Sequence, residues 1–466
     1  MKVVKNSLNY LKENFQISFT FLFGYLFLEI IICSFLGNPQ QQILPIILLA
    51  LNFIFLLISK EDKSSGYNVQ RLERFLAIVV ILNFFLFFTG KIAVESQFFD
   101  VLKKHTGINW KAIILVYLGF CMLPVFNVFK INFKKAVIPL LIFSISTCFV
   151  LPILFPDPFI DLYLILKQSI TDLNFLQNPY QRTFPDIYNG MYDYAYQKQP
   201  VKLVYWPLNV YLLYPFQIFF GDLRFANLFY LFLGCLILFW NFGNSRKVLF
   251  WSLALIFSCP YTFFMIKYGW IDTLAFPFFC LIFVSLKNGK SFYSFIFLGM
   301  LMALKLYYVM IFPFIVIYFL RLENTKKDLL KYTLICCIAF LISFLPFVLT
   351  DFTSIQYSIQ YFSNSKPRLD ALSIVGYLYQ FGKDFSTIFN LFTLGFALVM
   401  YYLFYQAKTI SITKLISYIS ITLFTVFLLA KQSFGNYYYN IILISVILVV
   451  FLLGKSLTPL KNQNEL

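Results

Sequence analysis

The sequence predicts an all-α, polytopic transmembrane protein with an extracytoplasmic loop that carries short helices at the membrane interface. Its 466 residues are 60% hydrophobic and 12% charged, whereas about 25% of the residues of a soluble domain are charged. Apolar runs of about 20 residues, the length of a helix that crosses a bilayer, recur from end to end. The alternating apolar and polar pattern of outer-membrane barrels is absent.

Each long apolar run defines a predicted membrane helix. In the first part of the chain the runs cover residues 16–36, 42–59, 74–93, 110–129 and 136–155. In the rest of the chain they cover residues 224–241, 248–267, 271–286, 291–304, 306–320, 329–349, 384–405, 415–430 and 437–453. The first run follows several lysines, as in a signal peptide. It is too long for one and lacks a cleavage site of small residues, so we expect a first membrane helix.

Basic residues lie in short clusters between these runs, which is typical of cytoplasmic loops. The clusters fall within residues 2–12, 60–74, 130–135, 246–247, 287–290, 321–331, 408–414 and 455–461. This distribution predicts about 14 crossings, two cytoplasmic ends and a first external loop at about 156–203. The net charge of +17 therefore indicates topology and contact with membrane lipids, and we expect no nucleic-acid partner.

One further apolar run, at residues 203–220, is one crossing too many. If it crossed the membrane, the basic clusters that follow it would no longer lie on the cytoplasmic side. It is short, rich in Tyr, and interrupted by Pro207 and Pro215. Prolines and interfacial aromatic residues favour a segment that lies at the outer interface or re-enters the membrane. The alternative is that this run crosses and one basic cluster breaks the positive-inside rule.

The residues that usually hold metals or cofactors form no motif in this chain. All eight cysteines lie in or beside apolar runs without C-x-x-C spacing, so we expect small core residues. The single histidine, His105, cannot form a metal site alone. Gly-rich phosphate loops, His-Glu-x-x-His motifs and Ser/His/Asp arrangements are absent from the sequence. We therefore expect no metal ligands and no required cofactor, and a divalent ion is unsupported.

Two carboxylates, Asp157 and Asp161, follow the apolar run at 136–155. Carboxylates at the edge of a membrane helix are costly, and they are often functional. Pro158 favours a turn and a new helix start, with Asp157 near an N-cap position. Asp157 is interpreted either as the N-cap of the next helix or as an assisting residue in a functional site. Asp161 is interpreted as a functional carboxylate or as a solvated residue on an interfacial helix.

Cations also occur on the predicted outer face, and each has a plain and a functional interpretation. Lys305 is a snorkelling lysine at a helix end or a ligand of an anionic head group. Arg368 is attracted to lipid head groups or grips a phosphate with two donors. Lys431 belongs to an aromatic belt or to the same anion site. Asp272 caps the next helix or orients a ligand hydroxyl.

Short motifs in a fixed order over residues 136–453 carry a resemblance to a known superfamily. They are Asp161-Leu162-Tyr163, Asn178-Pro179-Tyr180, Tyr205-Trp206-Pro207-Leu208, Gly269 to Asp272, Ala303-Leu304-Lys305, Arg368, and Asn436-Tyr437-Tyr438. In this order the chain resembles the GT-C superfamily of multi-spanning glycosyltransferases. It looks most like the bacterial mannosyltransferases that depend on polyprenyl-phosphate mannose. Leu176 and Trp206 depart from the pattern, which leaves the subfamily and the acceptor open.

The resemblance implies an inverting transfer of a sugar from a polyprenyl-phosphate donor to a hydroxyl of a glycan, glycolipid or protein acceptor. Asp161 would be the general base, and Lys305, Arg368 and Lys431 would bind the donor phosphate. The implied substrate-binding residues are Asp157, Tyr163, Asn178, Tyr180, Tyr205, Trp206, Asp272 and Asn436. The site would face the outside of the bacterial cytoplasmic membrane.

The resemblance also implies a division of the chain. Residues 1–135 would be accessory transmembrane helices, and residues 136–466 would form the catalytic transmembrane core. Two other functions remain open at this point. A flippase or transporter of lipid-linked sugars predicts repeats or charges at mid-membrane. A non-catalytic membrane scaffold with the same fold differs only in its lack of activity.

Overall fold

The computed structural model describes residues 73, 76–81, 83–84, 133–155, 157–191, 201–322, 326–407 and 410–455. The helices predicted at 16–36, 42–59 and 110–129, and His105, lie outside these residues. Only part of the helix predicted at 74–93 is described. The described residues are mostly helical, with one two-stranded antiparallel sheet of β1 (Thr183–Phe184) and β2 (Val201–Lys202). The all-α prediction is therefore confirmed at the level of fold class.

The chain divides into two compact units. Unit 1 contains residues 1–147, 242–263 and 445–466, and unit 2 contains residues 148–241 and 264–444. Within unit 1, the Asn83 side chain donates to the Ser258 hydroxyl at 3.2 Å, and the Ser144 hydroxyl donates to the Phe257 carbonyl. Both units combine segments that are distant in sequence. The predicted boundary near residue 135, between the accessory helices and the catalytic core, stays a prediction.

Among the residues that the structure describes, five helices are long and apolar enough to cross a membrane, or six if the bent pair Arg246–Ser258 and Pro260–Lys267 is one span. The five are α7 (Phe133–Leu154), α11 (Arg224–Asn241), α21 (Ser386–Gln406), α22 (Ile412–Leu429) and α23 (Gly435–Lys455). Their bounds agree with the predicted apolar runs within a few residues. These helices mark the chain as a membrane protein, while the total of about 14 crossings stays a prediction.

Several runs that we predicted as single helices are broken at prolines. The run at 248–267 is α12 (Arg246–Ser258) followed by α13 (Pro260–Lys267), with a bend of 69° between them. The run at 329–349 is α17 (Lys326–Leu341) and the short α18 (Leu345–Thr350). Each second helix starts at or beside a proline, which lacks the N–H group that would continue the preceding helix.

Two other predicted helices begin as 3-10 turns. The run at 271–286 is η2 (Ile271–Leu274) and α14 (Ala275–Lys287), and the run at 306–320 is η3 (Leu306–Ile311) and α16 (Phe312–Arg321). These turns position two predicted site residues, because Asp272 lies in η2 and Lys305 directly precedes η3.

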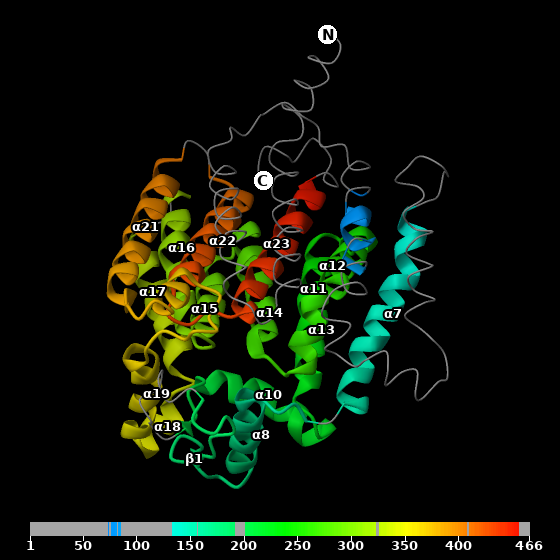
Figure 1. The fold of residues 1–466 in the computed structure, drawn as a ribbon. Helices are drawn as coiled ribbons and strands as arrows, with labels where there is room; N and C mark the ends of the chain where they lie inside the picture. Colours follow the sequence, from blue (N-terminus) through cyan, green and yellow to red (C-terminus); the bar gives the residue numbers. More distant parts are fainter. Residues whose placement is uncertain are drawn as a thin grey trace. The chain divides into compact units, whose positions relative to one another are not determined.

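Unit 2 also contains five shorter helices. They are α8 (Asp161–Asn174), α10 (Pro207–Phe220), α15 (Ser291–Met302), α19 (Phe352–Asn364) and α20 (Ile374–Tyr379). In Figure 1, α8, β1, α10, α18 and α19 gather below α15, α16, α17, α21 and α22. Helix α10 has 14 residues, fewer than the roughly 20 needed to cross a bilayer. Its place at the outer interface stays a prediction.

Candidate functional site

Asp161 is the first residue of α8 and lies seven residues after Leu154, the last residue of α7. One of its carboxylate oxygens accepts the Leu162 N–H at 2.7 Å and the Tyr188 hydroxyl at 3.4 Å. Burial raises the pKa of Asp161 above its usual range, although the Leu162 amide, the charge of Arg368 and the Tyr188 hydroxyl oppose that shift. Asp161 thus holds its proton more readily than an exposed aspartate.

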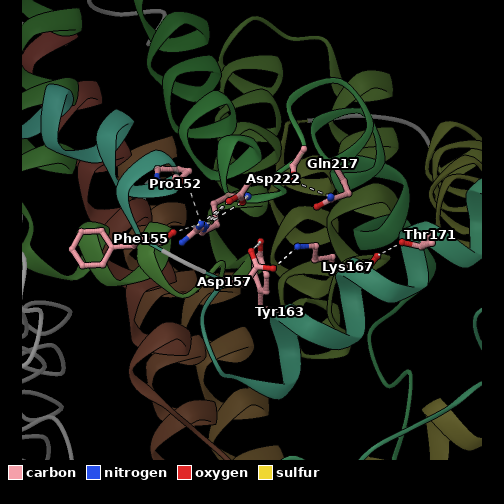
Figure 2. A network of polar contacts seen from close by, with 10 residues as sticks. Pro152, Phe155, Asp157, Tyr163, Lys167, Thr171, Gln217 and Asp222 are labelled. Carbon is pink, nitrogen blue, oxygen red and sulfur yellow. Dashed lines mark hydrogen bonds and ion pairs between the residues drawn. The ribbon is translucent and has the colours of Figure 1, made fainter.

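Asp157, four residues earlier, has a different environment. It accepts the Tyr163 hydroxyl at 2.8 Å and forms an ion pair with Lys167, as Figure 2 shows. Burial raises the pKa of Asp157, but the hydrogen bonds from Lys167 and Tyr163 lower it more, so the net shift is downward. The capping interpretation of Asp157 is wrong, because Ile160 is the N-cap of α8 and no side chain caps the helix.

Two of the three predicted phosphate ligands lie on loops that are joined to each other. The Arg368 N–H donates to the Lys431 carbonyl at 3.2 Å, and the Leu372 N–H donates to the Ser433 carbonyl at 2.6 Å. The Lys431 ammonium donates to the Ser365 carbonyl at 2.9 Å. Arg368 also acts electrostatically on Asp161. The fold therefore brings a predicted base and predicted phosphate ligands into one region.

Lys305, Asp272 and Asn436 meet in a buried polar cluster. The Lys305 ammonium lies 2.7 Å from one Asp272 oxygen, and Asn436 donates to the other at 2.7 Å. Asn440, one turn further along α23, donates to Asp272 at 3.0 Å. The Asp272 side chain is completely buried, and neither η2 nor α14 has a side-chain cap, so the capping interpretation of Asp272 is wrong.

Aromatic rings connect this buried cluster with Arg368. The Lys305 ammonium lies 4.5 Å from the centre of the Tyr437 ring, and the Tyr437 and Phe434 rings are 6.0 Å apart. The Arg368 guanidinium lies 4.6 Å from the centre of the Phe434 ring. Cations are attracted to the faces of aromatic rings, so Tyr437 and Phe434 help to hold both cations in place.

Tyr180 and Trp206, two of the predicted sugar-binding residues, serve as framework. Tyr180 is 1% exposed and its hydroxyl donates to the Tyr205 carbonyl at 2.6 Å. Trp206 is 8% exposed and packs edge-on against Phe340 and Phe344. Protein atoms cover both rings, so they pack as part of the framework, and their role in sugar binding stays a prediction.

The other predicted substrate ligands also have protein partners. The Asn178 side chain accepts the Tyr180 N–H at 3.0 Å and donates to the Thr350 hydroxyl at 2.9 Å, which joins the loop after α8 to the end of α18. Tyr163 is fully buried, and Tyr205 is half-buried and contributes its carbonyl to Tyr180.

Sequence reasoning missed several residues of this region. Tyr188, which contacts Asp161, lies in an irregular stretch with no periodic signal. Asn440 could have been found, because it follows Asn436 by four residues and therefore shares its helix face. Asp222 and Arg224 form a buried ion pair with an N–O distance of 2.6 Å, and sequence reasoning assigned no role to either residue.

Chemically, the region combines a carboxylate that can accept a proton with fixed positive charges that can stabilise an anion. Among the residues that the structure describes, no group of three His, Cys, Asp or Glu side chains is arranged as a metal site. Comparison of the chain with protein-family models, curated proteins and solved structures found no significant match.

Proposed function

We propose that this protein is a membrane glycosyltransferase that transfers a sugar from a polyprenyl-phosphate donor to an acceptor hydroxyl. The observation that supports this most is the grouping of Asp161, Arg368 and Lys431 in unit 2. Burial raises the pKa of Asp161, and the positive charge of Arg368 acts on its carboxylate. The backbone N–H of Arg368 donates to the Lys431 carbonyl. A base beside an anion site is what transfer from a phosphate-linked sugar needs.

In the proposed reaction the acceptor hydroxyl attacks the anomeric carbon of the donor. Asp161 takes the hydroxyl proton as the new carbon–oxygen bond forms, and the bond between the sugar and the phosphate breaks. The polyprenyl phosphate leaves with the bonding electrons, and the sugar inverts its anomeric configuration. A positioned base contributes about 10²- to 10⁴-fold to such a step.

Arg368 is the proposed direct ligand of the donor phosphate, together with Lys431. The Asp370 partner of Arg368 has a side chain that is 45% exposed. The Arg368 side chain itself is 12% exposed. Because Asp370 is open to solvent, the proposed binding step is the exchange of Asp370 for the donor phosphate on Arg368. The charge of Lys305 is balanced by Asp272, so its proposed role is to hold Tyr437 beside the site.

The proposed site faces the outside of the bacterial cytoplasmic membrane, where a glycan, glycolipid or protein supplies the acceptor hydroxyl. The positive-inside distribution of basic residues supports this side. The donor's prenyl chain would lie among the apolar helices, since lipid-linked sugars carry their chain within the bilayer.

The test is to incubate the purified full-length protein with a panel of polyprenyl-phosphate sugars and acceptor sugars and to measure released polyprenyl phosphate. We expect release that depends on the acceptor with at least one donor, without added metal. Movement of a donor across liposome membranes without any release would contradict the proposal and favour a flippase. Neither release nor movement with the whole panel would contradict the proposal and favour a scaffold.

A further inference from the structure

Arg224, the first residue of α11, is a buried arginine whose Nε and Nη2 atoms donate to a carboxylate and to two backbone carbonyls. It is 1% exposed, and an unpaired charge at such a position would be costly. Its Nε and Nη2 atoms donate to one oxygen of Asp222 at 2.9 and 2.6 Å. Asp222 also accepts the backbone N–H of Arg224 at 2.8 Å, so this pair is fixed to the beginning of α11.

The same guanidinium also binds the end of α7. Its Nη2 atom donates to the carbonyls of Pro152 at 3.1 Å and Phe155 at 2.9 Å, and Figure 2 shows both acceptors around it. The last carbonyls of a helix have no partner within the helix. Pro156 stands at the position whose N–H would bond the Pro152 carbonyl in a continuing helix, and proline has no N–H. Phe155 lies directly after the last residue of α7, and Arg224 donates to both carbonyls.

Arg224 makes a further contact, with Tyr163 on α8. The guanidinium lies 5.6 Å from the centre of the Tyr163 ring, and the Tyr163 hydroxyl donates to Asp157 at 2.8 Å. Gly269, with φ of +67°, lies against the same ring, because a Cβ atom there would be 2.7 Å from Tyr163 Cδ2. Tyr163 is therefore held on several sides, two residues after Asp161.

These contacts fix both ends of the segment at residues 155–160. Hydrogen bonds from Arg224 hold its first residue, and the ring of Tyr163 holds the helix that begins at its end. We infer that Arg224 is a positioning residue that sets the place of the Asp161 carboxylate. The inference rests on the proposed function for its catalytic meaning, but its structural content can be measured independently.

Lysine cannot replace Arg224 in this role. A guanidinium offers five donors in a rigid plane, whereas an ammonium is a point charge with three donors on a flexible stem. Arg224→Lys keeps the charge next to Asp222 but loses the fork that joins Asp222 to two carbonyls. Arg321→Lys is the matched control, because Arg321 also donates to two carbonyls at a helix end, those of Tyr405 at 2.6 Å and Ala407 at 2.8 Å.

The first experiment does not require activity. The full-length Asp161→Cys protein is labelled with a water-soluble maleimide, and the labelling rate at position 161 is followed by site-resolved mass spectrometry. Adding Arg224→Lys should raise this rate about 10-fold, because the helix start opens locally more often. Adding Arg321→Lys should leave it unchanged. Buried Cys336, 1% exposed, reports general unfolding.

An unchanged rate at position 161 would overturn the inference, and so would a rise at position 161 that Cys336 matches. If the Arg224→Lys protein does not accumulate, Tyr163→Leu is tested in its place, because it removes the ring that Arg224 contacts. The same rise in the labelling rate at position 161 is expected. The labelling rate measures how accessible position 161 is and does not depend on catalysis. The result is therefore valid even if no sugar transfer is found.

The second experiment measures sugar transfer. Arg224→Lys should lower kcat about 10- to 100-fold with the donor KM changed by less than about twofold, as expected when a reacting group is misplaced but substrate binding is kept. A wild-type kcat, or a rise in donor KM that accounts for the whole loss, would overturn the positioning role. Failure of the wild-type protein to transfer any sugar would instead count against the proposed function.

Discussion

Asp157 and Asp161 are only four residues apart, yet their environments shift their pKa values in opposite directions. Asp157 has a lysine and a tyrosine hydroxyl as direct partners, and its pKa is lowered. Asp161 is more buried, and its pKa is raised. Opposite shifts of neighbouring carboxylates are typical of sites that divide ionised and proton-accepting roles. This separation supports Asp161 as the proposed base and Asp157 as a permanently charged partner of Tyr163 and Lys167.

The raised pKa of Asp161 predicts a pH dependence of sugar transfer. A general base must be deprotonated, so kcat/KM should fall as the pH drops through the pKa of Asp161. Because burial raises this pKa, the fall should lie above the value of about 3.9 for a free aspartate. Tyr188→Phe removes a hydrogen bond that lowers the pKa, and should move the fall to still higher pH. A shift to lower pH in that variant would contradict the assignment.

Lys305 and Asp272 predict a loss of stability when only one of them is changed. Lys305→Met leaves a fully buried carboxylate without its cation, which typically destabilises a protein by about 3–5 kcal/mol. Adding Asp272→Asn removes that charge and keeps one acceptor oxygen, which can accept from Asn436 or from Asn440, so part of the stability should return. Thermal unfolding in detergent measures both variants. Equal midpoints for Lys305→Met and the wild-type protein would contradict the role of this ion pair.

At the scale of elements, hydropathy predicted where helices occur but not where they break. The runs that became α7, α11, α21, α22 and α23 were predicted closely, because a long apolar run has few alternatives in a membrane. The breaks that begin α13 and α18 occur at prolines visible in the sequence. Hydropathy averages over such residues, so proline chemistry has to be weighed separately.

Helices α15 and α17 pack closely at Gly299, which predicts sensitivity to substitution there. A Cβ atom on Gly299 would lie 2.3 Å from the Cys336 carbonyl oxygen, so the helices would have to move apart. We expect Gly299→Ala to destabilise the protein by about 1–3 kcal/mol. Gly395→Ala is the matched control, because no atom lies within 4 Å of its added Cβ, and alanine favours a helix. Similar unfolding midpoints for both variants would contradict this packing.

At the scale of the molecule, segments far apart in sequence meet within unit 2. Asn178 contacts Thr350, Gln181 contacts Asp351, and Lys305 contacts Asp272. The sequence predicted that these polar segments share one side of the membrane. Basic clusters indicate which loops are cytoplasmic, and the loops between them then lie on the opposite side. It could not predict which side chains pair, since partners such as Asn178 and Thr350 are 172 residues apart and have no local signal.

The predicted topology has its own test in intact cells. Gln181 lies in the loop predicted to be external, and Lys290 lies in a basic cluster predicted to be cytoplasmic. Both side chains are exposed, and each is replaced by cysteine in a separate variant. A membrane-impermeant maleimide should label position 181 in intact cells and position 290 only after permeabilisation. Labelling of position 290 in intact cells, or protection of position 181, would contradict the predicted orientation.

The most direct test of the central claim compares sugar transfer by wild-type protein and Asp161→Asn with a donor that the wild-type protein uses. Asparagine keeps the size of the side chain but cannot take the acceptor proton. Asp328→Asn, in the first turn of α17, serves as the control. We predict that Asp161→Asn folds and binds the donor normally but transfers about 10²- to 10⁴-fold more slowly, while Asp328→Asn keeps wild-type activity. Transfer by Asp161→Asn at the wild-type rate would contradict the account.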